Sequence, residues 1–191
     1  MSVPRVTVLA FAVALTASLV GVSVGHADDV DPCRARTDEA LGAAYDGHLT
    51  QARGLLQDVV VDSPGCAAAH AALATLGHET GLIEHPEYHE SRAIALAPRD
   101  ADVIGMLAMS RMARGDADAA RRLAALAVEL DCTHPWGRAV SGIFRMTDGE
   151  IAAGLDDVQA AHADAPRDPW IFSLLAIATS SASGLAAGSD L

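Results

Sequence analysis

Glycine and proline interrupt the alanine-rich and apolar runs of this chain at a fixed interval. The runs between them are rich in alanine and leucine, which favour helices, whereas glycine favours turns and proline ends helices. Each of the two series repeats every 34 residues, and their positions are Gly47, Gly81, Gly115 and Gly149, then Pro64, Pro98, Cys132 and Pro166. Two series in phase over four copies predict a repeated pair of helices with a glycine in the turn.

A unit numbered with the glycine at position 15 gives four repeats, 33–66, 67–100, 101–134 and 135–168. Small residues recur in these units at positions 8, 20 and 27, where they allow two antiparallel helices to approach closely. At positions 8, 20 and 27 in turn the units have Ala40, Ala74, Ala108 and Gly142; Ala52, Pro86, Ala120 and Gly154; Val59, Ala93, Ala127 and Ala161. The sequence therefore predicts an all-α fold.

This pattern resembles the tetratricopeptide repeat, whose unit is 34 residues in a helix–turn–helix. The match is strongest in the third unit, at Leu107, Ala108, Gly115, Asp116, Ala120 and the run Ala127–Asp131. The resemblance implies a right-handed α-solenoid of about four units followed by a C-terminal helix. The chain departs from the family at positions 4, 11 and 24, where large aromatic residues are usual and where Arg111 and Glu90 are two of the replacements.

The N-terminal residues have the order of a secretory signal peptide. An uncharged run from Val6 to Val24 precedes Gly25 and Ala27, which are small residues at positions −3 and −1 of a cleavage after Ala27, and acidic residues follow at once. We expect residues 1–27 to be removed on export to the cell envelope or exterior, and residues 28–32 to be a short linker. The alternative is an uncleaved anchor, which is the only expected route to the membrane.

A last helix is predicted over 169–182, because Asp168 is a helix-capping residue and Pro169 favours the first helical position. Residues 183–191 are expected to form a flexible tail. Between Asp168 and Asp190 the chain has no charged residue. Part of this apolar helix is therefore expected to meet a partner, and a homodimer or a self-associating structural role is one alternative function.

Charge excludes several partners. The chain has 13 basic residues and 25 acidic ones, a formal net charge of −12, and it contains neither lysine nor asparagine. An acidic surface argues against nucleic acid and anionic lipid. Tetratricopeptide proteins that clamp a carboxyl terminus use lysine and asparagine on the first helix of each unit, so that activity is also excluded.

The repeat geometry pairs two of the three cysteines. Cys33 and Cys66 flank the starts of neighbouring first helices, so a disulfide between them is expected in an oxidising compartment. The alternative is two buried thiols. Cys132 lies two repeats further on, too far for a disulfide with Cys66.

In this family positions 2, 5, 9, 12 and 13 of the first helix line a concave groove that holds a peptide or helix. These positions carry Arg34, Glu79 and the residues that we expect to bind a partner: Tyr45, His78, Asp102, Met109, Met112, Trp136, Ile143 and Met146. The methionines suit adaptable apolar recognition, although they could instead fill gaps between helices. The sequence thus favours a non-enzymatic scaffold for a protein or peptide, with no cofactor.

Histidines around the turn of the second unit offer the other alternative. His85 and His89 share a helix face, and His78 ends the preceding helix. With a neighbouring carboxylate they are weak candidates for a zinc or copper site in a metal-binding or catalytic envelope protein. The HExxH pattern is absent from the sequence.

Overall fold

The computed structural model describes residues 31–188. The expected signal peptide, residues 28–30 of the expected linker and residues 189–191 of the expected tail lie outside this range. Nine α-helices follow one another within it: α1 (Pro32–Tyr45), α2 (Leu49–Asp62), α3 (Ala67–Thr80), α4 (Pro86–Leu96), α5 (Ala101–Ala113), α6 (Ala117–Leu130), α7 (Pro135–Thr147), α8 (Ile151–Asp164) and α9 (Pro169–Gly188).

Each of the four repeats contains one helix pair, which we call helix A and helix B. The turn within each pair has its glycine at a positive φ, between 69° and 94°, a region that side chains disfavour. Before α6, Gly115 N donates to the Met112 carbonyl and Asp116 N to the Arg111 carbonyl. These bonds satisfy the last carbonyls of α5, so the glycine series ends helix A in every unit.

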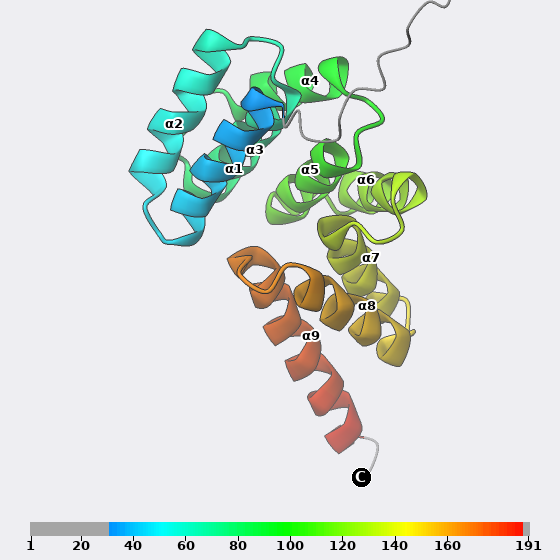
Figure 1. Ribbon diagram of the computed structural model, residues 1–191. Helices are drawn as coiled ribbons and strands as arrows, with labels where there is room; N and C mark the ends of the chain where they lie inside the picture. The colour runs from blue at the N-terminus through cyan, green and yellow to red at the C-terminus, as the bar shows by residue number, and fades with distance from the viewer. Residues whose placement is uncertain (1–30, 189–191) are drawn as a thin grey trace, which may run out of the picture.

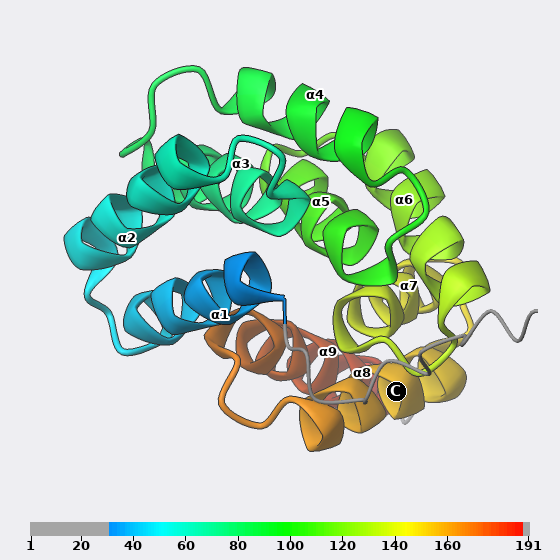
Figure 2. The same cartoon turned by 45° about the horizontal axis from the view of Figure 1, so that its top comes forward.

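The A helices α1, α3, α5, α7 and α9 lie on the inner side of a curved array, and the B helices lie on its outer side (Figures 1 and 2). Each A helix packs on the next one along the chain. The curvature is strong enough that Tyr45, at the end of α1, meets Trp170, at the start of α9, edge to face with ring centroids 5.5 Å apart. The first and last helices therefore meet across the concave side.

Small residues make the contact between helices A and B. Wherever positions 8, 20 and 27 of a unit hold alanine, that alanine is fully buried. In the fourth unit glycine stands at positions 8 and 20, and α7 and α8 approach so closely that a Cβ on Gly142 would lie 2.6 Å from the Gly154 carbonyl oxygen and 2.8 Å from Val158.

Gly142→Ala is accordingly expected to lower the free energy of unfolding by about 2–3 kcal/mol, because two backbones must move apart. Gly54→Ala is the matched control. A Cβ on Gly54, in the interior of α2, meets nothing within 4 Å, so the better helix propensity of alanine should stabilise by about 0.5–1 kcal/mol. Urea denaturation of both variants measures the difference, and equal effects would contradict the close approach of α7 and α8.

Two helices differ from the sequence prediction. Helix α4 begins only at Pro86, after His85 in a left-handed conformation with φ of 55°, because proline favours the first turn of a helix. The last helix runs to Gly188 instead of ending at residue 182. Serines continue it without breaking the hydrogen-bond ladder, since the Ser183 hydroxyl donates back to the Thr179 carbonyl. Most of the expected tail is therefore helical.

Charged side chains take the place of the missing aromatic residues between the second and third units. Glu90 is 2% exposed. Its carboxylate accepts a hydrogen bond from Arg111 Nε and lies 3.6 Å from Arg114 and 3.6 Å from His78 Nε2. This ionic network fills the space between α3, α4 and α5.

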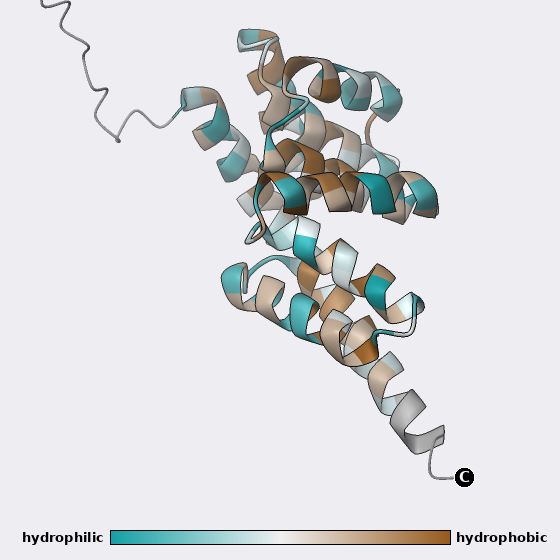
Figure 3. Ribbon diagram, turned by 90° about the vertical axis from the view of Figure 1, so that its right-hand side faces the viewer, coloured by the Kyte–Doolittle hydropathy of each residue, from teal (hydrophilic) through white to brown (hydrophobic). Residues whose placement is uncertain are grey.

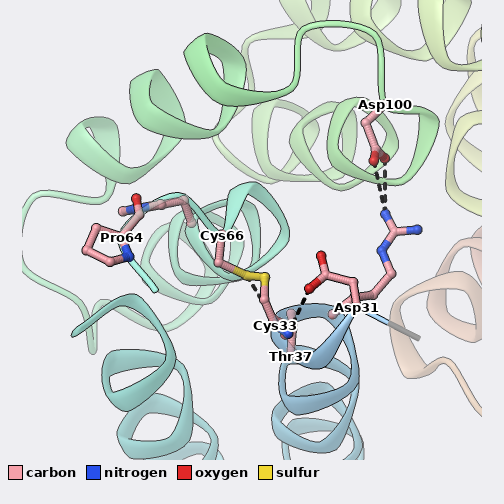
Figure 4. Close-up of a disulfide and its surroundings, with 8 residues drawn as sticks. Asp31, Cys33, Thr37, Pro64, Cys66 and Asp100 are labelled. Carbon is pink, nitrogen blue, oxygen red and sulfur yellow. Dashed lines mark hydrogen bonds and ion pairs between the residues drawn. A yellow bond between two sulfur atoms is a disulfide. The ribbon is translucent and has the colours of Figure 1, made fainter. Parts of the chain in front are cut away.

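A disulfide joins Cys33 and Cys66, the pair that the repeat geometry favoured, with Cα atoms 5.9 Å apart (Figure 4). It links the start of α1 to the residue before α3, and Thr37 lies beside it with its hydroxyl oxygen 3.7 Å from Cys66 Sγ. Cys132 is exposed and free. Across residues 31–188, each helix is too short or too polar to cross a membrane.

Candidate functional site

The concave side contains two neighbouring cavities, which we call the polar cavity and the apolar cavity. Their volumes are about 350 Å³ and about 270 Å³. The polar cavity is lined by Arg34, Asp38, Leu41, Tyr45, Ala68, Asp102, Met106, His134, Pro135, Trp136, Ala165 and Asp168. The apolar cavity is lined by Glu79, Met109, Met112, Ala113, Ile143, Trp170, Ser173, Leu174 and Ile177.

Asp168 connects three A helices at the polar cavity. One carboxylate oxygen caps α9 by accepting from the Trp170 and Ile171 amides, at 2.9 Å and 3.0 Å. The other accepts from the Tyr45 hydroxyl at 2.9 Å and from the Trp136 indole at 2.5 Å. Burial, together with the Asp168 charge, raises the pKa of Tyr45. The tyrosine is therefore a neutral donor that ties α1 to α9.

A second chain of contacts crosses the same cavity. Asp102 pairs with the Arg34 guanidinium and lies 2.8 Å from His134 Nε2. Gly137 N donates to His134 Nδ1, so Nε2 carries the hydrogen that is donated to Asp102. The hydrogen bond to His134 and the Arg34 charge together hold the pKa of Asp102 below its usual value.

Asp38 also lines the polar cavity, but it forms no ion pair within residues 31–188. Burial raises its pKa, the Arg34 charge lowers it, and the Asp102 charge raises it further. Arg34 is already paired with Asp100 and Asp102. Among the lining residues there are thus three carboxylates and one guanidinium, which leaves the polar cavity negative.

The apolar cavity has a single ionisable residue in its wall. Glu79, near the end of α3, lies among side chains of α5, α7 and α9 that are almost all apolar. Burial raises its pKa to about 7, although a hydrogen bond with Trp170 opposes the shift, and the Asp168 charge adds to it. Within residues 31–188, Glu79 forms no ion pair.

The structure brings most of the proposed partner-binding residues to the two cavities. Met109, Met112 and Ile143 line the apolar cavity, and Tyr45, Asp102 and Trp136 line the polar cavity. Two residues lie elsewhere. Met146 is 8% exposed and packs toward Gly154 of α8, and the His78 side chain is 5% exposed beside Glu90.

Other lining residues were not proposed as partner-binding from the sequence. Trp170 and Ile177 stand at positions 2 and 9 of a fifth unit that begins at residue 169, so extending the repeat by one helix identifies them. Asp38 and Asp168 lie outside the concave positions of the family. Nothing in their local sequence indicates that the array curves far enough to bring them to one cavity.

The three histidines that were weak metal candidates do not converge. His78 lies beside Glu90, and His85 is exposed before α4. His89 Nδ1 lies 2.9 Å from His70 Nδ1, and His70 Nε2 donates to the Pro64 carbonyl. Burial lowers the pKa of both His70 and His89, and residues 31–188 hold no cluster of three potential metal ligands.

Comparisons with known proteins identify the fold. No family model and no curated protein matches the sequence. The structure of PilF from Pseudomonas aeruginosa is similar with a TM-score of 0.55 at 18% identity, over 80% of this chain and 69% of that one. A mutant of MamA and MamA of AMB-1 have TM-scores of 0.48 and 0.46, at 18% and 19% identity, over 79% of this chain and 88% and 82% of theirs.

PilF and MamA have tetratricopeptide-type folds. Identity this low shows the fold alone, so the activities and partners of these proteins do not transfer to this chain. Together with four phased helix pairs, the likeness to PilF shows that the chain folds as an α-solenoid of tetratricopeptide type.

Proposed function

We propose that the protein is a non-enzymatic scaffold that binds a peptide segment of a partner protein on its concave side. The observation that carries this proposal is the convergence of helices α3, α5, α7 and α9 on the apolar cavity, next to a polar cavity. The methionine, tryptophan and isoleucine side chains of the apolar cavity suit adaptable apolar contacts.

The polar groups of the site also support binding over catalysis. Asp168 accepts hydrogen bonds from Tyr45 and Trp136. His134 donates to Asp102, so the polar groups of the wall already have partners within the protein. By contrast, Ile177 is 55% exposed at the apolar cavity. A guest that covers this side chain removes apolar surface from water, and such burial favours association.

Methionine-methyl NMR tests the proposal with an internal control. Peptides selected from a displayed random library on the purified protein should shift the methyl signals of Met109 and Met112, which line the apolar cavity. The Met146 signal should move little, because its side chain packs on α8. A uniform response of all methionines, or none, would contradict binding in the cavities.

Met112→Asn should weaken the selected peptides about tenfold, because an amide in an apolar contact must be desolvated without gaining an ion pair. Met112 is only partly buried, so helicity by circular dichroism should be retained. Met146→Glu is unsuitable for this test because it would place a carboxylate between α7 and α8.

We further propose that the scaffold acts outside the cytoplasm. The order of residues 1–27 and the disulfide between Cys33 and Cys66 support export, since disulfides persist in oxidising compartments. The N-terminal residue of the protein from its native host is the test. Asp28 indicates a cleaved signal peptide, whereas Met1 indicates a retained anchor.

A homodimer through α9 is a second candidate. Within residues 31–188 α9 packs on α8 but has no helix B of its own, and Ala176, at position 8, is exposed where the other units bury this residue, as is Phe172 at 59%. Figure 3 shows the coloured part of α9, which precedes the grey end beside the mark C, in pale tones without the deep teal of charged residues. Light scattering of the wild type and Phe172→Arg tests it, because a dimer through this face should become a monomer.

A further inference from the structure

We infer that the guest of the concave side carries a basic side chain, lysine or arginine, whose charged group pairs with Glu79 and whose stem lies in the apolar cavity. This inference rests on the proposed function and names the chemistry of the partner. It is carried by the position of one carboxylate in an otherwise apolar wall.

Glu79 is a carboxylate that lies among apolar side chains and has no cationic partner in the described part of the chain. Its side chain faces Met109 and Met112 of α5, Ile143 of α7, and Trp170 and Leu174 of α9. The one charge that shifts the pKa of Glu79 is that of Asp168, and Glu79 in turn acts on the neutral Tyr45, so neither neighbour supplies a positive charge. Along residues 31–188 no arginine pairs with it, so this partly buried carboxylate has a hydrogen bond with Trp170 but no cation of the protein beside it.

A basic side chain matches both features of the cavity. Lysine and arginine have apolar stems that pack along apolar surface while the charged end reaches a polar partner. The methionines and Ile143 would contact the stem, and the carboxylate would receive the charge. The Trp170 indole is a further attraction, because aromatic faces bind cations.

The neighbouring polar cavity strengthens the preference. Its three carboxylates, Asp38, Asp102 and Asp168, face one guanidinium, Arg34. A cavity lined mainly by one sign of charge attracts the opposite charge from a distance. A neutral guest would gain nothing from this field, and an acidic guest would be repelled by it.

A cycle of protein and peptide variants tests the inference on the full, oxidised chain. Peptides from the displayed random library are sequenced, and the tightest is synthesised with its basic residue and with norleucine in its place. We expect selection to enrich lysine or arginine beside apolar residues. Replacement by norleucine should weaken binding to the wild type about tenfold and should have little effect on Glu79→Gln.

The pH dependence provides a second readout. Glu79 pairs with a cation only when ionised, and burial raises its pKa to about 7. Affinity for the basic peptide should therefore increase from pH 6 to pH 8 in the wild type and stay constant in Glu79→Gln. Glu129→Gln, at an exposed position of the outer helix α6, is the control and should behave as the wild type does.

The outcomes separate this inference from the proposed function. Neutral or acidic peptides that shift the Met109 and Met112 signals would overturn the basic guest and leave the scaffold proposal in place. Basic peptides that bind Glu79→Gln as tightly as the wild type would also overturn it. If no selected peptide affects these methionines, the proposed function and this inference both fail.

Discussion

Arg111→Met is expected to lower the free energy of unfolding by about 3 kcal/mol, because it leaves the Glu90 carboxylate buried without its closest cation. Glu90 is 2% exposed, and Arg114 and His78 lie further from it, at 3.6 Å. A buried charge that loses its partner keeps the full cost of its removal from water. Chemical denaturation at neutral pH measures the loss.

Removing the acid instead of the arginine should lower the free energy of unfolding by less. Glu90→Gln leaves Arg111, whose side chain is 28% exposed and still lies 2.9 Å from Asp116, so about 1–2 kcal/mol is expected. Replacing both residues, Glu90→Leu with Arg111→Met, should recover most of the stability, since an apolar pair can replace a buried ion pair. Double-mutant analysis would then give a coupling well above 1 kcal/mol.

An exposed ion pair is the matched control for this network. Arg36 lies 2.8 Å from Asp62, and both side chains are largely exposed. Arg36→Met should change stability by less than about 0.5 kcal/mol. If Arg111→Met cost no more than this, Glu90 would not depend on its arginine, and the ionic network would not stabilise the contact between the second and third units.

The helix pairs were predictable because their signals are local. Glycine in the turn and small residues at the helix contact act within one unit, so a single sequence with four copies indicates both. The apolar cavity was predictable in part for the same reason, since Met109, Met112 and Ile143 occupy concave positions of the repeat. Trp170 and Ile177 follow from the same register once α9 is counted as a fifth helix A.

Other features depend on how closely particular helices approach. Met146 occupies a concave position, yet the absent side chain of Gly154 makes room for it between α7 and α8. His78 lies beside Glu90 because that acid stands where the family usually has an aromatic residue. In both cases the side chain is placed by a neighbouring residue that differs from the one usual at its repeat position. The repeat pattern describes the usual residues only and does not predict the effect of such a difference.

The polar cavity depends on the curvature of the whole array. Tyr45 and Asp168 are separated by 123 residues in the chain. Their contact requires the small rotations between successive repeats to add up to a path that brings α1 back to α9. No single unit encodes that sum, so the sequence identified Asp168 only as a helix cap.

Removing the disulfide is expected to cost about 3–4 kcal/mol, the value for a loop of this length. The two cysteines are 33 residues apart, so reduction frees a whole repeat in the unfolded chain. Cys33→Ala with Cys66→Ala should lower stability by this amount in urea denaturation under oxidising conditions, and a reductant should have no further effect on the variant. Cys132→Ala is the control and should leave stability unchanged, because this thiol is exposed and free.

Helix α1 should be the part of the fold that opens when the disulfide is absent. Its buried residues are Thr37, Ala40, Leu41 and Ala44, so it has one large apolar side chain to hold it against α2 and α3. Hydrogen exchange of α1 should therefore accelerate by up to about a hundredfold, while α5 and α7 stay protected. Because α1 also carries Arg34, Asp38 and Tyr45, its opening removes one wall of the polar cavity. Peptide affinity falls only in proportion to the fraction of molecules in which α1 is closed, so it should stay near the wild-type value while that form predominates, whereas unchanged protection of α1 would show that the disulfide does not hold this helix.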